Sequence, residues 1–293
     1  MDSLKIAELK RAHQEFFKTN KNQKIKFRVN YLKKLKRVID GNENLIFEAL
    51  HKDLKKPIFE SFASEILMIQ KEIDFFTKNL KALSAPVKVS GSLINFPSQD
   101  YIISEPYGNI LMISPWNYPF QLALVPLIGA IAAGNTVILK PSELTPITAL
   151  ELGLLSLEAG FPPGVFNIVN GEPKMIGKVL STNPVIKKIT FTGSTEVGKL
   201  LMKNSSSTVK NISLELGGNA PFIVFSDADL DAALNGFMMA KFRNAGQTCI
   251  SANRLFVHKS VSNIFTSKLL ERLKKLKVGD GMNGSDIGPL ISN

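Results

Sequence analysis

The sequence predicts an α/β protein in which N-terminal helices precede a doubly wound, Rossmann-like parallel sheet. Residues 1–84 carry apolar side chains at helical spacing, and from Gly108 onward short apolar runs alternate with helical segments. Strands that alternate with helices favour right-handed crossovers and a parallel sheet with helices on both faces. With 293 residues, the chain can form one large or two moderate domains.

The N-terminal third is expected to end in an extended arm. Helical periodicity runs through residues 25–50 and 59–83. The next segment, 85–105, contains Gly91 and Pro97 among alternating apolar residues. This pattern predicts a hairpin that could serve in oligomer assembly.

Strands and helices alternate in the middle of the chain. Strands are expected over 109–113, 136–139, 165–169, 188–191 and 212–216, and helices over 120–133, 146–160, 173–180 and 195–203. A strand at 221–225 and a helix at 229–243 then begin a second run.

Composition narrows the possible partners and compartments. The net charge is +11, and residues 1–40 hold 12 Lys/Arg against 4 Asp/Glu, which could mark a nucleic-acid or membrane surface. We favour a solvated helix face, because the basic positions alternate with apolar ones at helical spacing. No apolar run reaches the ~18 residues of a membrane span. The single cysteine and the absence of a secretory apolar core predict a reducing, cytoplasmic location.

Three separate residues carry the chemistry. Cys249 is the only cysteine. A lone cysteine is usually an inert core residue, but this sequence also contains a candidate base and a candidate oxyanion donor. Glu215 precedes two glycines, which give a carboxylate room to act as a general base, although a solvated strand end is the alternative. Asn117 lies between two prolines that can fix its amide as an oxyanion donor. Thiol, base and amide together indicate oxidation of an aldehyde through a thioester.

Two further segments indicate a nucleotide site. The loop 193–198 follows a strand and opens a helix, where backbone N–H groups favour an anion, although a tight turn without a ligand fits equally well. Lys140 and Glu143 follow a strand at its carboxyl end and could bond ribose hydroxyls, or could form a solvated ion pair. A glutamate there would repel a 2′-phosphate, which favours NAD over NADP.

Arg243 lies six residues before Cys249 and has three possible roles. It could lower the pKa of the thiol, bind an acidic substrate through two hydrogen bonds, or close the last turn of a helix. The three histidines, at positions 13, 51 and 258, show no metal-ligand spacing, and no metal is expected.

Together these motifs make the chain resemble the aldehyde dehydrogenase superfamily. Leu214–Asn219 and Gly246–Cys249 are similar to the two active-site signatures of the family. Pro115–Pro119 and Lys140–Glu143 are similar to further family motifs.

The resemblance implies a mechanism and its residues. The Cys249 thiolate attacks the aldehyde carbon, the Asn117 amide and the Cys249 backbone N–H hold the alkoxide, and Glu215 activates the water that releases the acid. Hydride passes to NAD or NADP. The residues implied around the dinucleotide are Trp116, Lys140, Glu143, Gly193, Ser194, Thr195, Glu196, Val197 and Gly198, although the rings of Trp116 and Tyr118 could equally be core aromatics.

Subfamily signals differ along the chain. Residues up to about Glu143 are similar to fatty- and aromatic-aldehyde dehydrogenases, and those from about Gly164 to succinate-semialdehyde dehydrogenases. The latter resemblance implies two arginines that grip the substrate carboxylate; Arg243 matches one, and Val125 occupies the other position. Ser251 stands where such enzymes often carry a second cysteine, so a disulfide switch is not expected.

The resemblance also predicts an incomplete protein, because family members continue well over a hundred residues beyond Asn293. We expect a dinucleotide-binding domain over 1–213 and the first portion of a catalytic domain over 214–293. The strands that begin at Pro221 and Arg254 should then lack partners and expose an edge.

Three function classes stay open. The chain could be an NAD(P)-dependent aldehyde dehydrogenase, a non-catalytic fragment that binds dinucleotide or needs a separately encoded remainder, or a thioesterase. Family members form homodimers or tetramers, and the C-terminal strand used for this would be missing. No nucleic-acid or membrane partner is expected.

Overall fold

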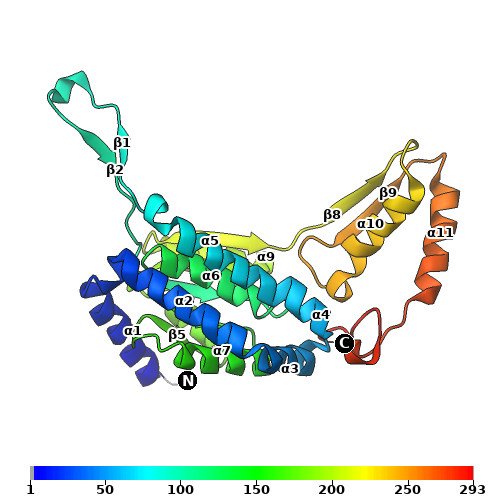
Figure 1. Ribbon diagram of the computed structural model, residues 1–293, viewed down its shortest axis with the longest axis horizontal. Coiled ribbons are helices and arrows are strands. Elements are labelled where there is room, and N and C mark those ends of the chain that lie inside the picture. Colours follow the sequence, from blue (N-terminus) through cyan, green and yellow to red (C-terminus); the bar gives the residue numbers. More distant parts are fainter. Residues whose placement is uncertain (1–2, 293) are drawn as a thin grey trace.

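The computed structural model describes residues 3–292, which form a layered body, a slender arm and a smaller lobe (Figure 1). The body is built on a five-stranded sheet in the order β5–β4–β3–β6–β7, and all its pairings are parallel. This confirms the predicted doubly wound sheet. Its strands are β3 (Asn109–Ile113), β4 (Thr136–Lys140), β5 (Phe166–Ile168), β6 (Ile186–Gly193) and β7 (Asn211–Leu216).

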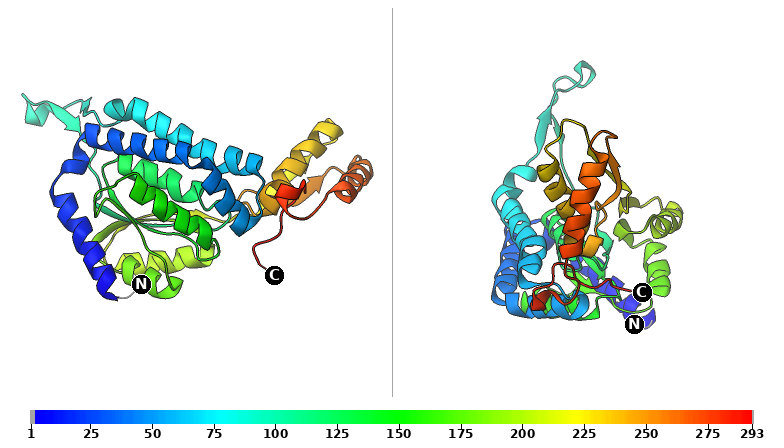
Figure 2. Two further views of the ribbon diagram at one scale, coloured as in Figure 1. Left: turned by 60° about the horizontal axis from the view of Figure 1, so that its bottom comes forward. Right: turned by 90° about the vertical axis from the view of Figure 1, so that its right-hand side faces the viewer.

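Helices cover both faces of this sheet (Figure 2). The helices of the body are α1 (Ser3–Lys18), α2 (Ile25–Gly41), α3 (Glu43–Leu54), α4 (Ile58–Ser61), α5 (Leu67–Leu83), α6 (Gln121–Ala132), α7 (Pro146–Glu158), α8 (Pro173–Ser181) and α9 (Thr195–Ser206). The larger core lies under α2, α5, α6 and α7, and a second core lies under α1, α8 and α9. The central strands are therefore buried on both sides: Leu111 and Ile138 are fully buried, as expected for continuous apolar runs in a parallel sheet.

The helix predicted over 59–83 is not uniform. A π-helical turn, η2 (Phe62–Ile66), joins α4 to α5, and the Leu67 N–H donates to the Phe62 carbonyl five residues earlier. A π turn inserts one extra residue into a helix and is frequent at functional sites. The periodicity of apolar residues did not reveal it.

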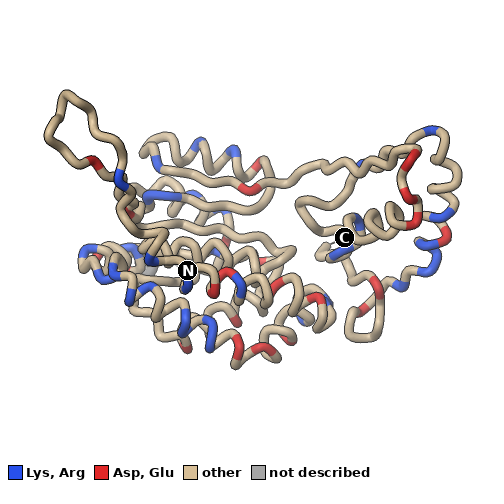
Figure 3. Tube along the Cα trace, turned by 45° about the horizontal axis from the view of Figure 1, so that its top comes forward, with Lys and Arg blue, Asp and Glu red and all other residues tan. Residues whose placement is uncertain are grey.

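Helix α2 has the buried apolar side and the exposed basic side that its residue spacing predicted. Leu32, Leu35 and Ile39 of α2 are buried, whereas Lys33 and Arg37 are exposed. Figure 3 shows lysines and arginines spread along these helices with acidic residues among them. None of the helices in residues 3–292 combines the length and apolarity needed to cross a bilayer.

The predicted hairpin is present and projects from the body (Figure 1). It consists of β1 (Val87–Val89) and β2 (Asp100–Ile102), which pair antiparallel. At its tip Leu93 and Ile94 are more than nine-tenths exposed, and Phe96 is 80% exposed.

The lobe contains a second, two-stranded sheet. Its elements are β8 (Ala220–Val224), α10 (Leu230–Phe242), the short turn η4 (Arg243–Gly246), β9 (Ala252–Val257) and α11 (Ser262–Lys275). Strands β8 and β9 pair with each other in parallel, a pairing that was not predicted. Each still has one edge without a strand partner among residues 3–292. Helix α11 was not predicted.

After α11 the chain returns to the body. The His51 ring bonds the Asp280 carboxylate at 2.7 Å, and the Gly281 N–H donates to the Lys55 carbonyl. The Ile291 N–H donates to the side chain of Gln247. The lobe is thus joined to the body where β7 leads into β8 and again through this returning segment.

Candidate active site

The loop that carries Cys249 begins with a sharp turn after α10. Asn244, Ala245 and Gly246 have φ angles of 52°, 56° and 75°, so three consecutive residues adopt the left-handed conformation. Two of them are not glycine, and such conformations cost roughly 1–3 kcal/mol each and cluster at functional sites. The turn leaves Cys249 as a free, exposed thiol.

Asn117 is bonded directly to this loop. Its Nδ2 donates to the Gln247 carbonyl at 2.8 Å, and Asn244 Nδ2 donates to the Asn117 carbonyl at 2.8 Å. The Tyr118 hydroxyl and the Thr248 hydroxyl are 3.0 Å apart. The segment after β3 and the cysteine loop, about 130 residues apart in sequence, are therefore cross-linked by three side-chain hydrogen bonds.

Arg243 and Cys249 line one cavity of about 680 Å³. Apolar residues form much of its wall, and Glu60 and Asp286 are its acidic residues. The remaining lining residues are Pro57, Phe59, Ala63, Ser64, Met68, Tyr118, Gln121, Leu122, Phe242, Asn244, Ala245, Thr248, Ile250 and Gly288.

The electrostatics of this cavity act on Tyr118. Burial raises the pKa of its phenol above the ordinary value, and the hydrogen bond with Thr248 and the positive charge of Arg243 work against that rise. Tyr118 therefore stays protonated near neutral pH and can donate as well as accept. Val125, the position matched to a second arginine, packs against the larger core and does not line the cavity.

Glu215 lies near the end of β7 and is exposed, which agrees with the alternative of a solvated strand end. Its carboxylate forms no hydrogen bond or ion pair within residues 3–292. Its segment does approach the cysteine loop, because a Cβ added to Gly218 would lie 3.7 Å from the Cys249 carbonyl oxygen. A carboxylate three residues away along an open, glycine-flanked segment has room to turn toward the thiol.

The loop 193–198 has the predicted strand-to-helix geometry. Strand β6 ends at Gly193, and the Ser194 hydroxyl caps α9 by accepting from the Val197 N–H at 3.3 Å. The first residues of α9 are exposed, so their backbone N–H groups are accessible to an anion. Close packing also favours glycine at position 198, since a Cβ there would lie 2.9 Å from the Leu216 side chain.

Lys140 and Glu143 lie together at the carboxyl end of β4. The buried Lys140 ammonium donates to the Glu143 carboxylate, and both line a hollow of about 370 Å³ with Asn170 and Glu172. Partial burial, the largest single influence, would raise the pKa of Glu143, but the hydrogen bond from Lys140, a hydrogen bond to its own backbone and the positive charge of Lys140 together outweigh burial and lower that pKa below the usual value. Glu143 is therefore an ionised acceptor, suited to hydroxyl groups.

The sheet explains why these residues gather. Parallel strands present their carboxyl ends at one edge, and the register pairs Ile113 of β3 with Lys140 of β4 and Thr192 of β6 with Glu215 of β7. Half-buried Trp116 follows the end of β3 at the same edge. The predicted site residues thus lie at one edge of the sheet, and the lobe adds Arg243 and Cys249.

Sequence reasoning missed an ion pair beneath this site. Lys56 and Glu65 are both buried, and Lys56 Nζ donates to Glu65 Oε1 and, at 2.9 Å, to the Asn117 carbonyl. A lysine before proline and a glutamate in a helical run are ordinary in sequence. Lys56 precedes α4 and Glu65 lies in the π turn, so their contact is not evident from helical periodicity.

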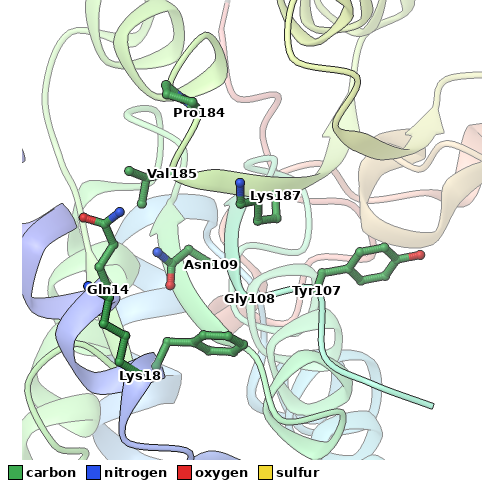
Figure 4. A pocket seen from close by; sticks show the side chains of 9 residues that line it. Gln14, Lys18, Tyr107, Gly108, Asn109, Pro184, Val185 and Lys187 are labelled. Atoms are coloured by element: carbon green, nitrogen blue, oxygen red, sulfur yellow. The ribbon is translucent and has the colours of Figure 1, made fainter. Parts of the chain in front are cut away.

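A separate hollow lies at the opposite, amino-terminal edge of the sheet (Figure 4). It has a volume of about 330 Å³ and is lined by residues that include Gln14, Lys18, Tyr107, Asn109 and Lys187. None of the predicted site residues lines it. No group of three or more His, Cys, Asp or Glu side chains in the described chain could hold a metal ion.

Comparisons with known proteins place this geometry in a family. A model of the aldehyde dehydrogenase family matches residues 3–293. The chain is 41% identical over 286 residues, 97% of its length, to "Succinate-semialdehyde dehydrogenase [NADP(+)] 1" of Schizosaccharomyces pombe, and covers 56% of that relative. It is 50% identical over 191 residues to "Succinate-semialdehyde dehydrogenase [NADP(+)] GabD" of Escherichia coli, covering 65% of this chain and 40% of that relative.

Solved structures agree over the whole described fold. An aldehyde dehydrogenase from Brucella melitensis has a TM-score of 0.92 and 40% identity, covering 100% of this chain and 60% of that one. A succinate-semialdehyde dehydrogenase from Burkholderia pseudomallei has a TM-score of 0.91 and 39% identity, covering 98% and 59%. The chain therefore spans between two fifths and three fifths of the length of these relatives. It belongs to the aldehyde dehydrogenase family, and the predicted likeness to succinate-semialdehyde dehydrogenases is confirmed.

Proposed function

We propose that this chain provides the dinucleotide-binding part and the nucleophile of an NAD(P)-dependent aldehyde dehydrogenase. In this proposal residues 1–213 form the dinucleotide-binding domain, and residues 214–293 form a portion of the catalytic domain. The observation that carries it is the cross-link between the Asn117 amide and the loop of Cys249, at the edge of a parallel sheet where open α/β proteins bind ligands.

The side chains support the two bond-making steps. An exposed Cys249 thiol, once deprotonated, can add to an aldehyde carbon. An amide nitrogen carries two hydrogens, so Asn117 can hold the Gln247 carbonyl with one and the developing alkoxide with the other. Glu215, which is exposed and beside two glycines, can take the proton of the water that releases the acid.

The donor set at the sheet edge fits a nicotinamide dinucleotide. The exposed start of α9, at loop 193–198, would receive the pyrophosphate, and Lys140 with the ionised Glu143 would bond ribose hydroxyls. We assign Trp116 to the same site because it follows β3 at this edge. When bound, the dinucleotide supplies the hydride acceptor. Glu143 favours NAD, whereas the names of two relatives given above specify NADP(+).

The relatives also bear on the substrate. We propose an aldehyde with a carboxylate at its far end, gripped by Arg243, because succinate semialdehyde is named for the relatives and Arg243 lines the cavity of Cys249. Glu60 and Asp286 in the same cavity, and the apolar Val125, would weaken this grip. A fatty or aromatic aldehyde is the competing substrate.

Steady-state kinetics of the purified chain test the proposal. We expect reduced nicotinamide to form only when both dinucleotide and aldehyde are present, with a higher kcat/KM for succinate semialdehyde than for hexanal or benzaldehyde. Replacement of Arg243 by Leu should remove that preference and leave kcat for hexanal unchanged. Absence of turnover, together with a Cys249 that resists thiol reagents, would contradict the proposal.

A second candidate is a dinucleotide-binding fragment without turnover. It is favoured by one observation, the coverage of only 56–60% of the length of relatives matched along most of this chain. Calorimetry that detects NAD or NADP binding without aldehyde oxidation would support it. Ester cleavage that needs no dinucleotide would instead indicate a thioesterase.

We further propose that the arm serves in assembly of a homodimer or tetramer. The support is its projecting hairpin with Leu93, Ile94 and Phe96 almost fully in water, since contiguous exposed apolar residues mark interaction surfaces. Light scattering of a variant with serine at all three positions should show a smaller species than the unmodified chain.

A further inference from the structure

The loops of Asn117 and Cys249 rest on the helix that contains the π turn. Glu65 Oε2 accepts from the backbone N–H groups of Phe120 and Gln121, at 2.8 and 3.1 Å. These groups open helix α6, which has no side-chain cap of its own. A carboxylate at a helix N-terminus is stabilising, so Glu65 fixes the point at which the segment of Asn117 becomes helical.

Lys56 completes this anchor. Its ammonium is paired with Glu65, donates to the Asn117 carbonyl at 2.9 Å, and lies 4.4 Å from the centre of the Tyr118 ring. The contacts that Lys56 and Glu65 make with the Asn117 segment fall on the Asn117 carbonyl, on Tyr118 and on the start of α6. None of them uses the side-chain nitrogen of Asn117. The side-chain amide is thereby held in place, with one of its two N–H groups bonded to the Gln247 carbonyl and the other available to a substrate oxygen.

The same helix also holds the cysteine loop. Glu60 Oε1 accepts from the backbone N–H of Asn244 at 2.9 Å, at the first left-handed residue of the turn. In a regular α-helix of 3.6 residues per turn, positions five apart point roughly 140° away from each other. The π turn between Glu60 and Glu65 adds a residue and brings both carboxylates toward the two loops.

We infer that Lys56, Glu60 and Glu65 are positioning residues that set the distance between the oxyanion donor and the nucleophile. The inference rests on the proposed function for its kinetic consequence, but the geometric claim stands without it. Lys56 and Glu65 act on the Asn117 segment, and Glu60 acts on the Cys249 loop. The π turn is the device that lets one helix reach both.

The double variant Lys56→Met/Glu65→Gln tests the action of Lys56 and Glu65 on the Asn117 segment. Because both charges are removed together, neither is left buried and unpaired. Hydrogen exchange by mass spectrometry should show amides of residues 117–121 exchanging at least tenfold faster than in the unmodified chain. If the chain turns over, kcat should fall at least tenfold while the KM for the dinucleotide stays within twofold. Lys52→Met, an exposed change on α3, should alter neither.

Glu60→Ala tests the action of Glu60 on the Cys249 loop. This variant also keeps the inference testable if the double variant does not fold. It removes the acceptor for the Asn244 N–H and one negative charge from the wall of the cavity, and we expect the melting temperature to stay within a few degrees while exchange over 244–249 accelerates at least fivefold. The rate at which dithiobis-nitrobenzoate labels the single thiol should change at least threefold. Folded variants with exchange, labelling and kcat all within twofold of the unmodified chain would overturn the inference.

These readouts separate two kinds of failure. An unmodified chain that makes no reduced nicotinamide contradicts the proposed function, whereas exchange and labelling still measure the positions of the loops. If the variants of an active chain show the expected faster hydrogen exchange but an unchanged kcat, the positioning role is contradicted and the proposed function is not.

Discussion

The body and the lobe both contain parallel strands, but they bury them differently. Every residue of β4 in the body is buried, because helices cover both faces of the sheet. In the lobe only one face of the two-stranded sheet is covered, by α10 and α11, and Ile223 and Phe256 remain 56% and 51% exposed. A strand that is apolar on both sides but covered on one contributes about half of its possible burial energy.

The better-buried region and the region that carries the nucleophile are therefore different parts of the molecule. The body has two cores of its own and supplies Asn117, Lys140 and the loop 193–198 from strand ends. The lobe has one small core and supplies the thiol. The site depends on hydrogen bonds that hold the less buried region against the more buried one.

The largest expected effect is loss of the nucleophile in the lobe. Replacement of Cys249 by Ser should lower aldehyde-dependent formation of reduced nicotinamide at least ~10³-fold, because an alcohol of ordinary pKa is a poor nucleophile here. Circular dichroism and dinucleotide affinity should not change, since Cys249 is exposed and lies outside the body. Ser207→Ala on the body surface is the control, and residual turnover above a tenth of normal would place the chemistry elsewhere.

On the body side, replacement of Asn117 by Ala should cost ~10²–10³-fold in kcat through loss of an oxyanion donor. It also removes the bond to the Gln247 carbonyl, so hydrogen exchange over the cysteine loop should accelerate. Asn79→Ala, which deletes an exposed amide on α5, serves as the matched control. A loss of less than threefold, with unchanged exchange, would show that this amide neither holds the loop nor the alkoxide.

Acid should weaken the body before the lobe. His13, on the buried side of α1, is fully buried, and burial lowers its pKa to about 4, which the neighbouring Asn167 side chain offsets only in part. As the pH falls below 6.5, the unfolded chain binds a proton that the folded chain refuses, so stability decreases until the pH reaches about 4. The loss should approach ~3 kcal/mol.

Urea unfolding at pH 7, 5.5 and 4 measures this loss. His13→Leu should flatten the dependence over that range, whereas His258→Gln, on an exposed loop of the lobe, should not. Equal pH dependence in the unmodified chain and His13→Leu would assign the effect to another group.

The smallest expected effect concerns cofactor choice at the edge of the body. Glu143→Gln removes the charge that would repel a 2′-phosphate and frees the Lys140 ammonium, so the ratio of kcat/KM for NADP to that for NAD should rise about tenfold, equivalent to about 1.4 kcal/mol. Calorimetric affinities give the same ratio if turnover is absent. Glu196→Gln, in the first turn of α9, tests whether loss of any acidic residue near the site changes this ratio. An equal shift in that variant would show that Glu143 has no specific role in cofactor choice.

The body was largely predictable from sequence, and the lobe less so. Runs such as 109–113 and 136–139 have no polar interruption, so periodicity predicted their strands and the order of helices between them. Helix α11 was missed because its polar pattern, with Phe265 as its one fully buried residue, resembles a solvated segment. The pairing of β8 with β9 depends on a contact across about thirty residues that local pattern does not encode.

The candidate site divides in the same way. Cys249, Asn117 and the loop 193–198 follow short motifs and were named from sequence. Lys56 and Glu65 were missed, since Lys56 precedes α4, Glu65 lies in the π turn, and helical spacing does not predict a contact between them. For Glu215 the sequence left a general base and a solvated strand end open, and the observed exposure agrees with the solvated strand end.

The returning segment after α11 has a mechanical consequence. A lobe fixed only where β7 leads into β8 could swing about that one link in any direction. The bonds of Asp280 and Gly281 to the end of α3 and the segment after it supply a second pivot. Together with the hydrogen bonds that join Asn117 and Tyr118 to the cysteine loop, this second pivot opposes rotation of the lobe about the first link, so relative movement of thiol and sheet is restricted.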